Sequence, residues 1–175
     1  MSESPKTIFT SKHLEVLQKG RWIYASRPNI TGIVIIAAIT DENEIVLVEQ
    51  FRIPVNAVVI ELPAGLVGDN DIDSKEDLVT GAKRELLEET GYEAAEWEEL
   101  FTGPPSAGMT TEVVTFFRAK KLKCLHPGGG VDGEKITVHR VPVSKAVAWL
   151  QQKQTEGLLI DPKVFAGLYF AGIQC

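Results

Sequence analysis

Cysteine is scarce in this chain, which contains only Cys124 and Cys175 among its 175 residues. Two thiols so far apart cannot form a disulfide framework or supply the ligands of a structural zinc site. An excess of positive charge is also missing, because 18 Lys and Arg stand against 24 Asp and Glu. Non-specific nucleic-acid binding needs a basic surface, so no nucleic-acid partner is expected. The few thiols fit the reducing cytoplasm.

Long hydrophobic runs are absent as well. The longest, residues 32–39, has the length of a strand and is too short to span a bilayer. Residues 1–6 lack the basic region and apolar segment of a signal peptide. We therefore expect a soluble, cytoplasmic protein with no membrane partner. With 44% hydrophobic and 24% charged residues, the chain can build a core, and its length favours one domain, 1–175.

The order of apolar and polar segments is that of an α/β protein. The β-branched residues 32–39, a polar turn and residues 44–49 predict a β-hairpin. Further strands are expected at 57–62, 99–101, 113–117 and 136–141, and helices at 145–154 and 162–171, with Ser144 and Asp161 as their N-caps. Such a mixed order favours a sheet covered by helices.

One further helix begins after residue 74. Ser74, with Asp77 three residues later, resembles an N-terminal capping box, and Gly91 is placed to end the helix. Its apolar stripe consists of Leu78, Ala82 and Leu86.

The other face of this helix is acidic. Glu85, Glu88 and Glu89 share it, at a cost of roughly 0.2–0.5 kcal/mol for each like-charged pair. Their place near the C-terminal end is also unfavourable for negative charge. Arg84, four residues before Glu88, is able to orient it. A solvated acidic surface is one explanation; the other is a site for a divalent, oxygen-seeking cation, Mg²⁺ or Mn²⁺, which would offset the charge cost.

Residues 84–92, Arg-Glu-Leu-Leu-Glu-Glu-Thr-Gly-Tyr, resemble the core of the Nudix box, and Glu76 stands at the spacing of its upstream acid. The glycine that the pattern expects falls on Asn70; Gly65 fits better and implies a five-residue insertion in a loop, which costs little. Three further segments resemble the branch of ADP-ribose and nucleoside-diphosphate-sugar pyrophosphatases: residues 49–54, 61–65 and 131–136.

The resemblance implies a Nudix α/β/α sandwich with a mixed β-sheet and a short N-terminal β segment. It implies Mg²⁺-dependent hydrolysis of the diphosphate bond of nucleoside-diphosphate sugars, ADP-ribose included, to a nucleoside monophosphate and a sugar phosphate. It also implies a homodimer in which residues 1–28 contribute to the dimer and to the base pocket. Ile53, Val55 and the strand expected at residues 57–60 are apolar enough to contribute to that interface.

The resemblance further assigns the metal site. Glu85 and Glu89 are expected to ligate Mg²⁺, for which Mn²⁺ could substitute, together with the backbone carbonyl of Ala64. Glu88 either ligates directly or acts through water, and Arg84 holds the carboxylates in position.

The late acidic loop follows a glycine run, Gly128–Gly130, which we expect to pack loosely and to serve as a lid over the substrate. The resemblance makes Glu134 the candidate general base or third metal ligand, with Asp132 as the alternative. Glu76 is expected to support the loop before the acidic helix.

Substrate contacts are expected from two arginines, since a guanidinium can make two parallel bonds to a phosphate. These are Arg27 and Arg52, for which a surface ion pair is the alternative. The resemblance adds Met109 and Glu112, in the loop 106–112, as substrate contacts.

The resemblance also places Trp22 against the base. Ile23 stands where the branch often has a glutamate that reads adenine, and Ala107 replaces a proline of the branch. We therefore expect loose discrimination between bases.

Two other functions remain open. One is hydrolysis of another Nudix substrate, such as a nucleoside triphosphate, a dinucleoside polyphosphate or capped RNA. The other is an inactive sensor that binds ADP-ribose. The intact glutamates of the box and the absence of residues for a DNA-binding domain disfavour the sensor.

Overall fold

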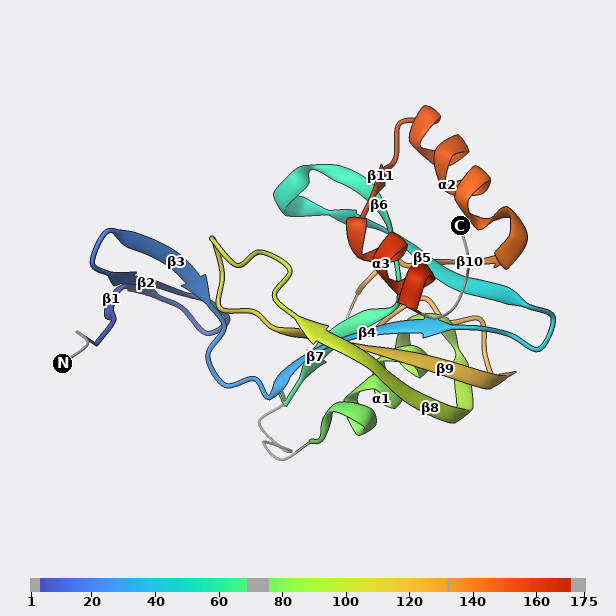
Figure 1. Cartoon of the computed structure of the whole chain (residues 1–175), viewed down its shortest axis with the longest axis horizontal. Helices are drawn as coiled ribbons and strands as arrows, with labels where there is room; N and C mark the ends of the chain where they lie inside the picture. Colours follow the sequence, from blue (N-terminus) through green and yellow to red (C-terminus); the bar gives the residue numbers. More distant parts are fainter. Residues whose placement is uncertain (1–3, 69–75, 132, 171–175) are drawn as a thin grey trace.

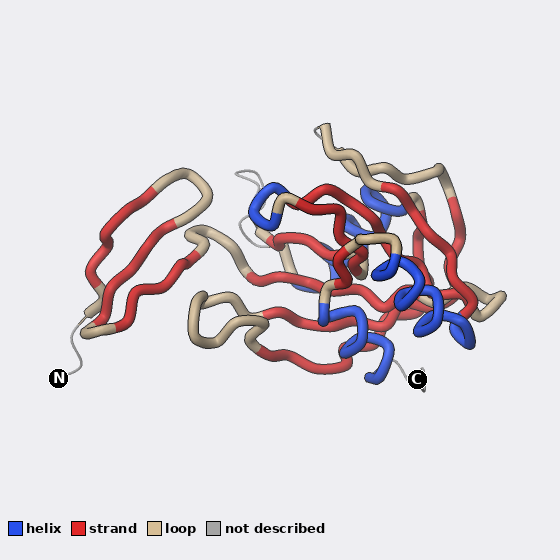
Figure 2. Tube along the Cα trace, turned by 90° about the horizontal axis from the view of Figure 1, so that it is seen from above, coloured by secondary structure: helices blue, strands red, loops and turns tan. Residues whose placement is uncertain are grey.

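The structure, a computed structural model, describes residues 4–68, 76–131 and 133–170. Within them, two four-stranded sheets and three α-helices form the body of the molecule. A three-stranded sheet at the N-terminus stands apart from that body, as both views show (Figures 1 and 2). None of the helices in the described ranges is long and apolar enough to cross a membrane.

The two sheets of the body are mixed. In spatial order, the first consists of β7 (Ala64–Val67), β4 (Gly32–Ala38), β9 (Val114–Cys124) and β8 (Tyr92–Gly103). The second consists of β10 (Thr137–Pro142), β5 (Glu44–Arg52), β6 (Ala57–Glu61) and β11 (Leu159–Ile160). Each contains one parallel pair, β4 with β9 and β6 with β11. The expected mixed α/β class is confirmed, and each expected strand lies largely within one of the strands of these two sheets.

The expected hairpin of residues 32–39 and 44–49 is wrong. These segments form β4 and β5, which belong to different sheets and share only an isolated bridge, Ile39 to Ile45. The reason lies in β4, which is buried on both faces. Ile35 packs into one hydrophobic core and Ile36 into the other. A strand of this kind belongs in the middle of a sheet with a layer on each side, so β4 takes β7 and β9 as neighbours.

The helices supply those two layers (Figure 1). Leu86 of α1 (Leu78–Thr90) lies in the core below β4. Leu150 of α2 (Ala146–Thr155) and Leu168 of α3 (Pro162–Phe170) lie in the core above it. Two short 3-10 helices, η1 (Ile53–Val55) and η2 (Val143–Lys145), complete the body.

The helix caps match the expectations in part. Asp77, not Ser74, is the N-cap of α1: its carboxylate accepts the N–H of Thr80 at 2.9 Å. Ser74 lies outside the described residues. Ser144 lies within η2 and caps nothing, because the 3-10 turn delays the start of α2. Asp161 is confirmed, since its carboxylate accepts the N–H of Lys163 at 2.8 Å. Gly91 ends α1 with a φ of +75°.

The N-terminal sheet is antiparallel and mostly exposed. It consists of β1 (Lys6–Thr10), β2 (Glu15–Lys19) and β3 (Trp22–Ser26). Its hydrogen bonds to the body include those of Ala25, whose N–H donates to Met109 and whose carbonyl accepts from Thr111. A small sheet with no hydrophobic layer of its own is marginal in water, so it needs a neighbour.

Two leucines of α1 provide a test of this packing. Leu86 is fully buried, and Leu86→Ala should lower the free energy of unfolding by about 2–5 kcal/mol through lost burial and a cavity. Leu87 is partly exposed on the same helix, so Leu87→Ala is the matched control and should lower the free energy of unfolding by roughly 1 kcal/mol. Urea unfolding measures both; equal losses would contradict the placement of α1.

Candidate functional site

A cleft of about 630 Å³ opens where α1, β7 and the end of β6 meet. Its charged lining residues are Arg27, Arg52, Glu61, Glu85, Glu89, Glu112, Glu134 and Lys163. Ala64 and Gly65 form part of its wall. The fold therefore brings together most of the residues that the sequence singled out, from segments more than 100 positions apart.

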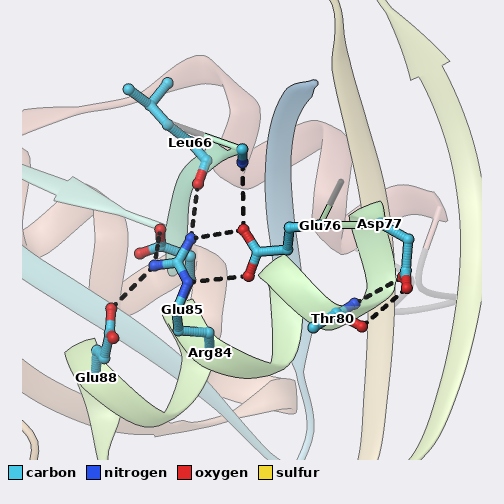
Figure 3. Close-up of polar contacts among 8 residues, drawn as sticks. Leu66, Glu76, Asp77, Thr80, Arg84, Glu85 and Glu88 are labelled. Atoms are coloured by element: carbon cyan, nitrogen blue, oxygen red, sulfur yellow. Dashed lines mark hydrogen bonds and ion pairs between the residues drawn. The ribbon is translucent and has the colours of Figure 1, made fainter. Parts of the chain in front are cut away.

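Arg84 connects the acidic side chains around α1 (Figure 3). Its Nη1 donates to Glu85 at 2.8 Å and to Glu88 at 3.1 Å. Its Nε donates to Glu76 at 3.1 Å, and its Nη2 donates to the carbonyl of Leu66 at 2.9 Å. Burial by itself lowers the pKa of Arg84, but its bonds to Glu76 and Glu85 outweigh this and raise that pKa. Arg84 is a permanent cation that fixes three carboxylates and one strand.

Glu76 bonds Arg84 and does not line the cleft. Its carboxylate accepts the N–H of Gly68 at 3.2 Å as well as the bonds from Arg84. The hydrogen bond from Arg84 is the main cause of its lowered pKa. Glu76 thus ties the residue after β7 to α1, a geometry that suits support of the loop.

Glu89 is the buried carboxylate of the cleft, with 5% of its surface exposed. The N–H of Ala64 donates to its Oε2 at 3.1 Å. Burial raises the pKa of Glu89 to about 8, against that hydrogen bond and with help from the charges of Glu85 and Glu134. A carboxyl group in this position is costly to ionise without a cation nearby.

Gly65 makes room for the neighbouring carboxylate. A Cβ atom added there would lie 1.9 Å from the carboxyl carbon of Glu85. Any side chain at this position would displace Glu85, so β7 and α1 can approach only with glycine between them.

Both arginines of the cleft are paired with acids. Arg27 Nε donates to Glu112 and Arg52 Nε donates to Glu61, each at 2.7 Å. Sequence reasoning did not assign Glu61 a role, although its place at the end of an apolar strand just before Pro63 was a signal. It also missed Lys163 on α3, whose ammonium group is paired with Asp161 and whose place in the cleft only the fold reveals.

Besides Arg84, three of the expected site residues lie outside the cleft lining. Trp22 is 55% exposed and lines a separate cavity of about 330 Å³ with Tyr24 and Ala107. The side chain of Met109 is exposed and lines neither cavity. Glu88 turns toward Arg84 instead of into the cleft. Asp132 lies outside the described residues, so its assignment stays a prediction.

The expectation of a loosely packed glycine run is wrong. The N–H of Gly129 donates to the carbonyl of Glu89 at 2.9 Å, and the N–H of Gly130 donates to that of Glu88 at 3.1 Å. The last carbonyls of an α-helix have no hydrogen-bond donor within the helix, and here the N–H groups of the glycine run donate to them. Gly128–Gly130 is therefore packed against the end of α1 and is not a free lid.

Comparison with known proteins identifies the family. The NUDIX domain family matches residues 30–159. The chain belongs to the NUDIX family. This Nudix chain is 31% identical over 144 residues to a methanol dehydrogenase activator of Bacillus methanolicus, covering 82% of the chain and 73% of that protein.

Two further relatives are named as pyrophosphatases. Over 124 residues the chain is 32% identical to an ADP-ribose pyrophosphatase of Bacillus subtilis, covering 70% of the chain and 64% of the relative. Over 137 residues it is 38% identical to a GDP-mannose pyrophosphatase of Klebsiella pneumoniae, covering 66% of each. With the box glutamates in place, these relatives identify a Nudix hydrolase.

A solved structure described as an ADP compounds hydrolase confirms the fold. It superposes with a TM-score of 0.64 at 18% identity and covers 86% of this chain and 85% of its own.

The donor set of the Nudix cleft fits a hard divalent cation. Among residues 4–68, 76–131 and 133–170, no three His, Cys, Asp or Glu side chains are gathered tightly enough to hold a metal by themselves. Within these ranges, the cleft is nevertheless lined by five glutamates and by no His or Cys, and carboxylate oxygens are the ligands that Mg²⁺ prefers. A cation would also relieve the cost of ionising Glu89.

The raised pKa of Glu89 predicts how stability depends on pH without metal. Its folded pKa of about 8 exceeds its ordinary 4.5, so the protonated form is favoured by folding. This contribution is complete below pH 4.5 and is lost as the pH rises to 8. Between pH 5.5 and 8 in EDTA, the free energy of unfolding of the wild type should therefore fall by roughly 3 kcal/mol more than that of the Glu89→Gln variant.

Urea unfolding at several pH values measures this difference. Glu96→Gln, an exposed substitution on β8, is the control and should keep the wild-type dependence. If the stability of Glu89→Gln depended on pH as the wild type does, another group would be responsible.

Proposed function

We propose that this Nudix hydrolase cleaves the diphosphate bond of nucleoside-diphosphate sugars such as ADP-ribose, giving a nucleoside monophosphate and a sugar phosphate. One observation carries the proposal: a single cleft combines Glu85 and the buried Glu89 of α1 with two arginines. A diphosphate bound through cations needs both kinds of group. The names of the pyrophosphatase relatives support the same substrate class.

Mg²⁺ would be held by Glu85 and Glu89 with the carbonyl of Ala64, and by Glu88 either directly or through a water molecule. Mn²⁺ is the expected substitute, because it accepts the same oxygen ligands. When bound, the cation would neutralise the diphosphate and acidify a water molecule. Arg84 keeps Glu85 and Glu88 turned toward one another through its Nη1.

The arginines would bind the phosphates through donors that their ion pairs do not use. Arg27 and Arg52 each bond a carboxylate through Nε, and the guanidinium group has further donors available for a phosphate. Their ion pairs with Glu112 and Glu61 hold them at the wall of the cleft, which lowers the entropy cost of binding. Lys163 adds a third positive charge.

Glu134 would accept the proton of the attacking water. Its side chain lines the cleft, and its charge acts on Glu89 across it. A carboxylate so close to the acidic helix is suited to general-base catalysis or to a third ligand for the metal. Asp132, two residues earlier, is the alternative for this role.

The cavity beside Trp22 would take the base. It adjoins the cleft at the loop 106–112, where Ser106 lines the cleft and Ala107 lines the cavity. Met109, in the same loop, bonds β3 through its backbone and would contact the substrate at the rim. Ile23 cannot accept a hydrogen bond from an adenine amino group, so stacking on Trp22 would discriminate little between bases.

A substrate panel tests the proposal. With Mg²⁺, ADP-ribose, ADP-glucose, GDP-mannose and UDP-sugars are compared by phosphate release after phosphatase treatment. We expect the wild-type kcat/KM values for ADP- and GDP-linked sugars to lie within about tenfold of each other. In Glu89→Gln and Glu85→Gln, kcat/KM should fall at least a hundredfold, because each change removes a charge that would hold the metal. Glu96→Gln is the control that keeps the charge change but lies away from the cleft. No hydrolysis of any sugar nucleotide would refute the proposal, and a preference of a thousandfold for ADP-ribose would refute the permissive base pocket.

We also propose that the chain is a cytoplasmic homodimer. The exposed thiol of Cys124 fits a reducing compartment. The N-terminal sheet exposes Ile8, Phe9 and Ile23 to at least 50%, and Ile53 on η1 is 82% exposed. A second copy that covers these side chains would supply the hydrophobic layer that the sheet lacks.

Light scattering at micromolar concentration tests the dimer. The wild type should have twice the chain mass of 19.2 kDa, and Ile53→Asp should shift the measured mass toward that of the monomer. Leu125→Asp, an equally polar change at a 46% exposed position beyond the end of β9, should leave the mass unchanged. A fully active wild-type monomer would exclude this assembly.

A further inference from the structure

The chain crosses the C-terminal end of α1 at a point where only glycine fits. After β9, residues 125–130 pass directly over that end. A Cβ atom added to Gly91 would lie 1.8 Å from the carbonyl oxygen of His126. One added to Gly128 would lie 2.5 Å from the carbonyl oxygen of Glu89. Both glycines also have left-handed φ angles, +75° and +73°. The two backbones therefore touch without side chains between them.

Backbone hydrogen bonds fasten this crossing. Besides the bonds of Gly129 and Gly130 to the carbonyls of Glu89 and Glu88, the N–H of Leu125 donates to the carbonyl of Gly91 at 2.8 Å. The loop thus satisfies three carbonyls at or next to the helix end that would otherwise face water. Its donors also oppose the negative end of the helix dipole, next to the acidic cluster.

Glu134 is attached directly to the fastened loop. Its N–H donates to the carbonyl of Val131 at 3.0 Å, and its Oε2 accepts the N–H of Val131 at 3.3 Å. Gly130 packs against it, since a Cβ there would lie 2.6 Å from both Cβ and Oε2 of Glu134. The position of the Glu134 carboxylate therefore follows from the position of the crossing.

We propose that Gly91 and Gly128 are positioning residues: the close crossing that they permit sets the place of the Glu134 carboxylate relative to the glutamates of α1. This inference rests on the proposed function, in which Glu134 takes the proton of the attacking water. Glu85 and Glu89 are fixed to each other by the helix, whereas Glu134 comes from a segment more than 40 residues later. The crossing is what joins the two parts of the site at a defined separation.

A double-mutant cycle tests the proposal on the panel substrate with the highest kcat/KM. Gly128→Ala should lower kcat at least tenfold while KM and the half-saturating Mg²⁺ concentration change less than threefold, because the helix residues and arginines stay in place. In the Glu134→Gln background, Gly128→Ala should cost less than a further threefold, since the group that it positions is already lost. Gly157→Ala, at a glycine with a φ of +92° and open space around it, controls for backbone strain and should keep the wild-type kcat.

Three outcomes would overturn the proposal: an unchanged kcat in Gly128→Ala, an equal loss in the Glu134→Gln background, or a loss that appears mainly in KM. Gly130→Ala repeats the cycle if Gly128→Ala does not fold, because the three atoms nearest to its added methyl group all belong to the side chains of Glu134 and Ile136.

Amide exchange examines the crossing without any substrate. The amides of Gly129 and Gly130 should be protected in the wild type and exchange at least tenfold faster in Gly128→Ala. Unprotected amides in the wild type would overturn the inference itself. Absence of hydrolysis across the panel, with these amides protected, would instead refute the proposed function.

Discussion

The guanidinium group of Arg84 is the contact on which the rest of the site depends. It bonds Glu76, Glu85 and Glu88 at once, and it also holds the carbonyl of Leu66 in β7. Without it, the acidic face of α1 would be repelled by its own charges and by the end of the helix dipole. A lysine could not replace it, because a single ammonium group lacks the planar set of five donors. Arg84 therefore sets both the charge balance of the helix and its distance from the strand beside it.

The sequence predicted those features that arise from neighbouring residues. The apolar stripe of α1 and its end at Gly91 are local patterns, and both are present. The Asp161 cap is local in the same sense. Ser144 failed as a cap because the 3-10 turn before α2 depends on how the chain leaves β10, which no short pattern contains.

Which strands pair with one another could not be predicted from the sequence, for a related reason. Residues 32–39 and 44–49 look like a hairpin because a polar turn separates two apolar runs. What decides their partners is that β4 is buried on both faces, and this depends on helices far along the chain. The pair of Arg27 is equally non-local, because its acid, Glu112, lies 85 residues away. The glycine run was misread because its partner, the end of α1, is about 40 positions distant in the sequence and in contact in space.

The two cavities share no lining residue, although they adjoin at Ser106 and Ala107. The one beside Trp22 is built from the N-terminal sheet and the loop 106–112, and the acidic cleft is built mainly from the body of the fold. Exchanging side chains around Trp22 leaves every carboxylate and arginine of the cleft with its present partner. With the base in the Trp22 cavity, as proposed above, substitutions there would change the nucleotide preference while the cleft that binds the diphosphate stays the same.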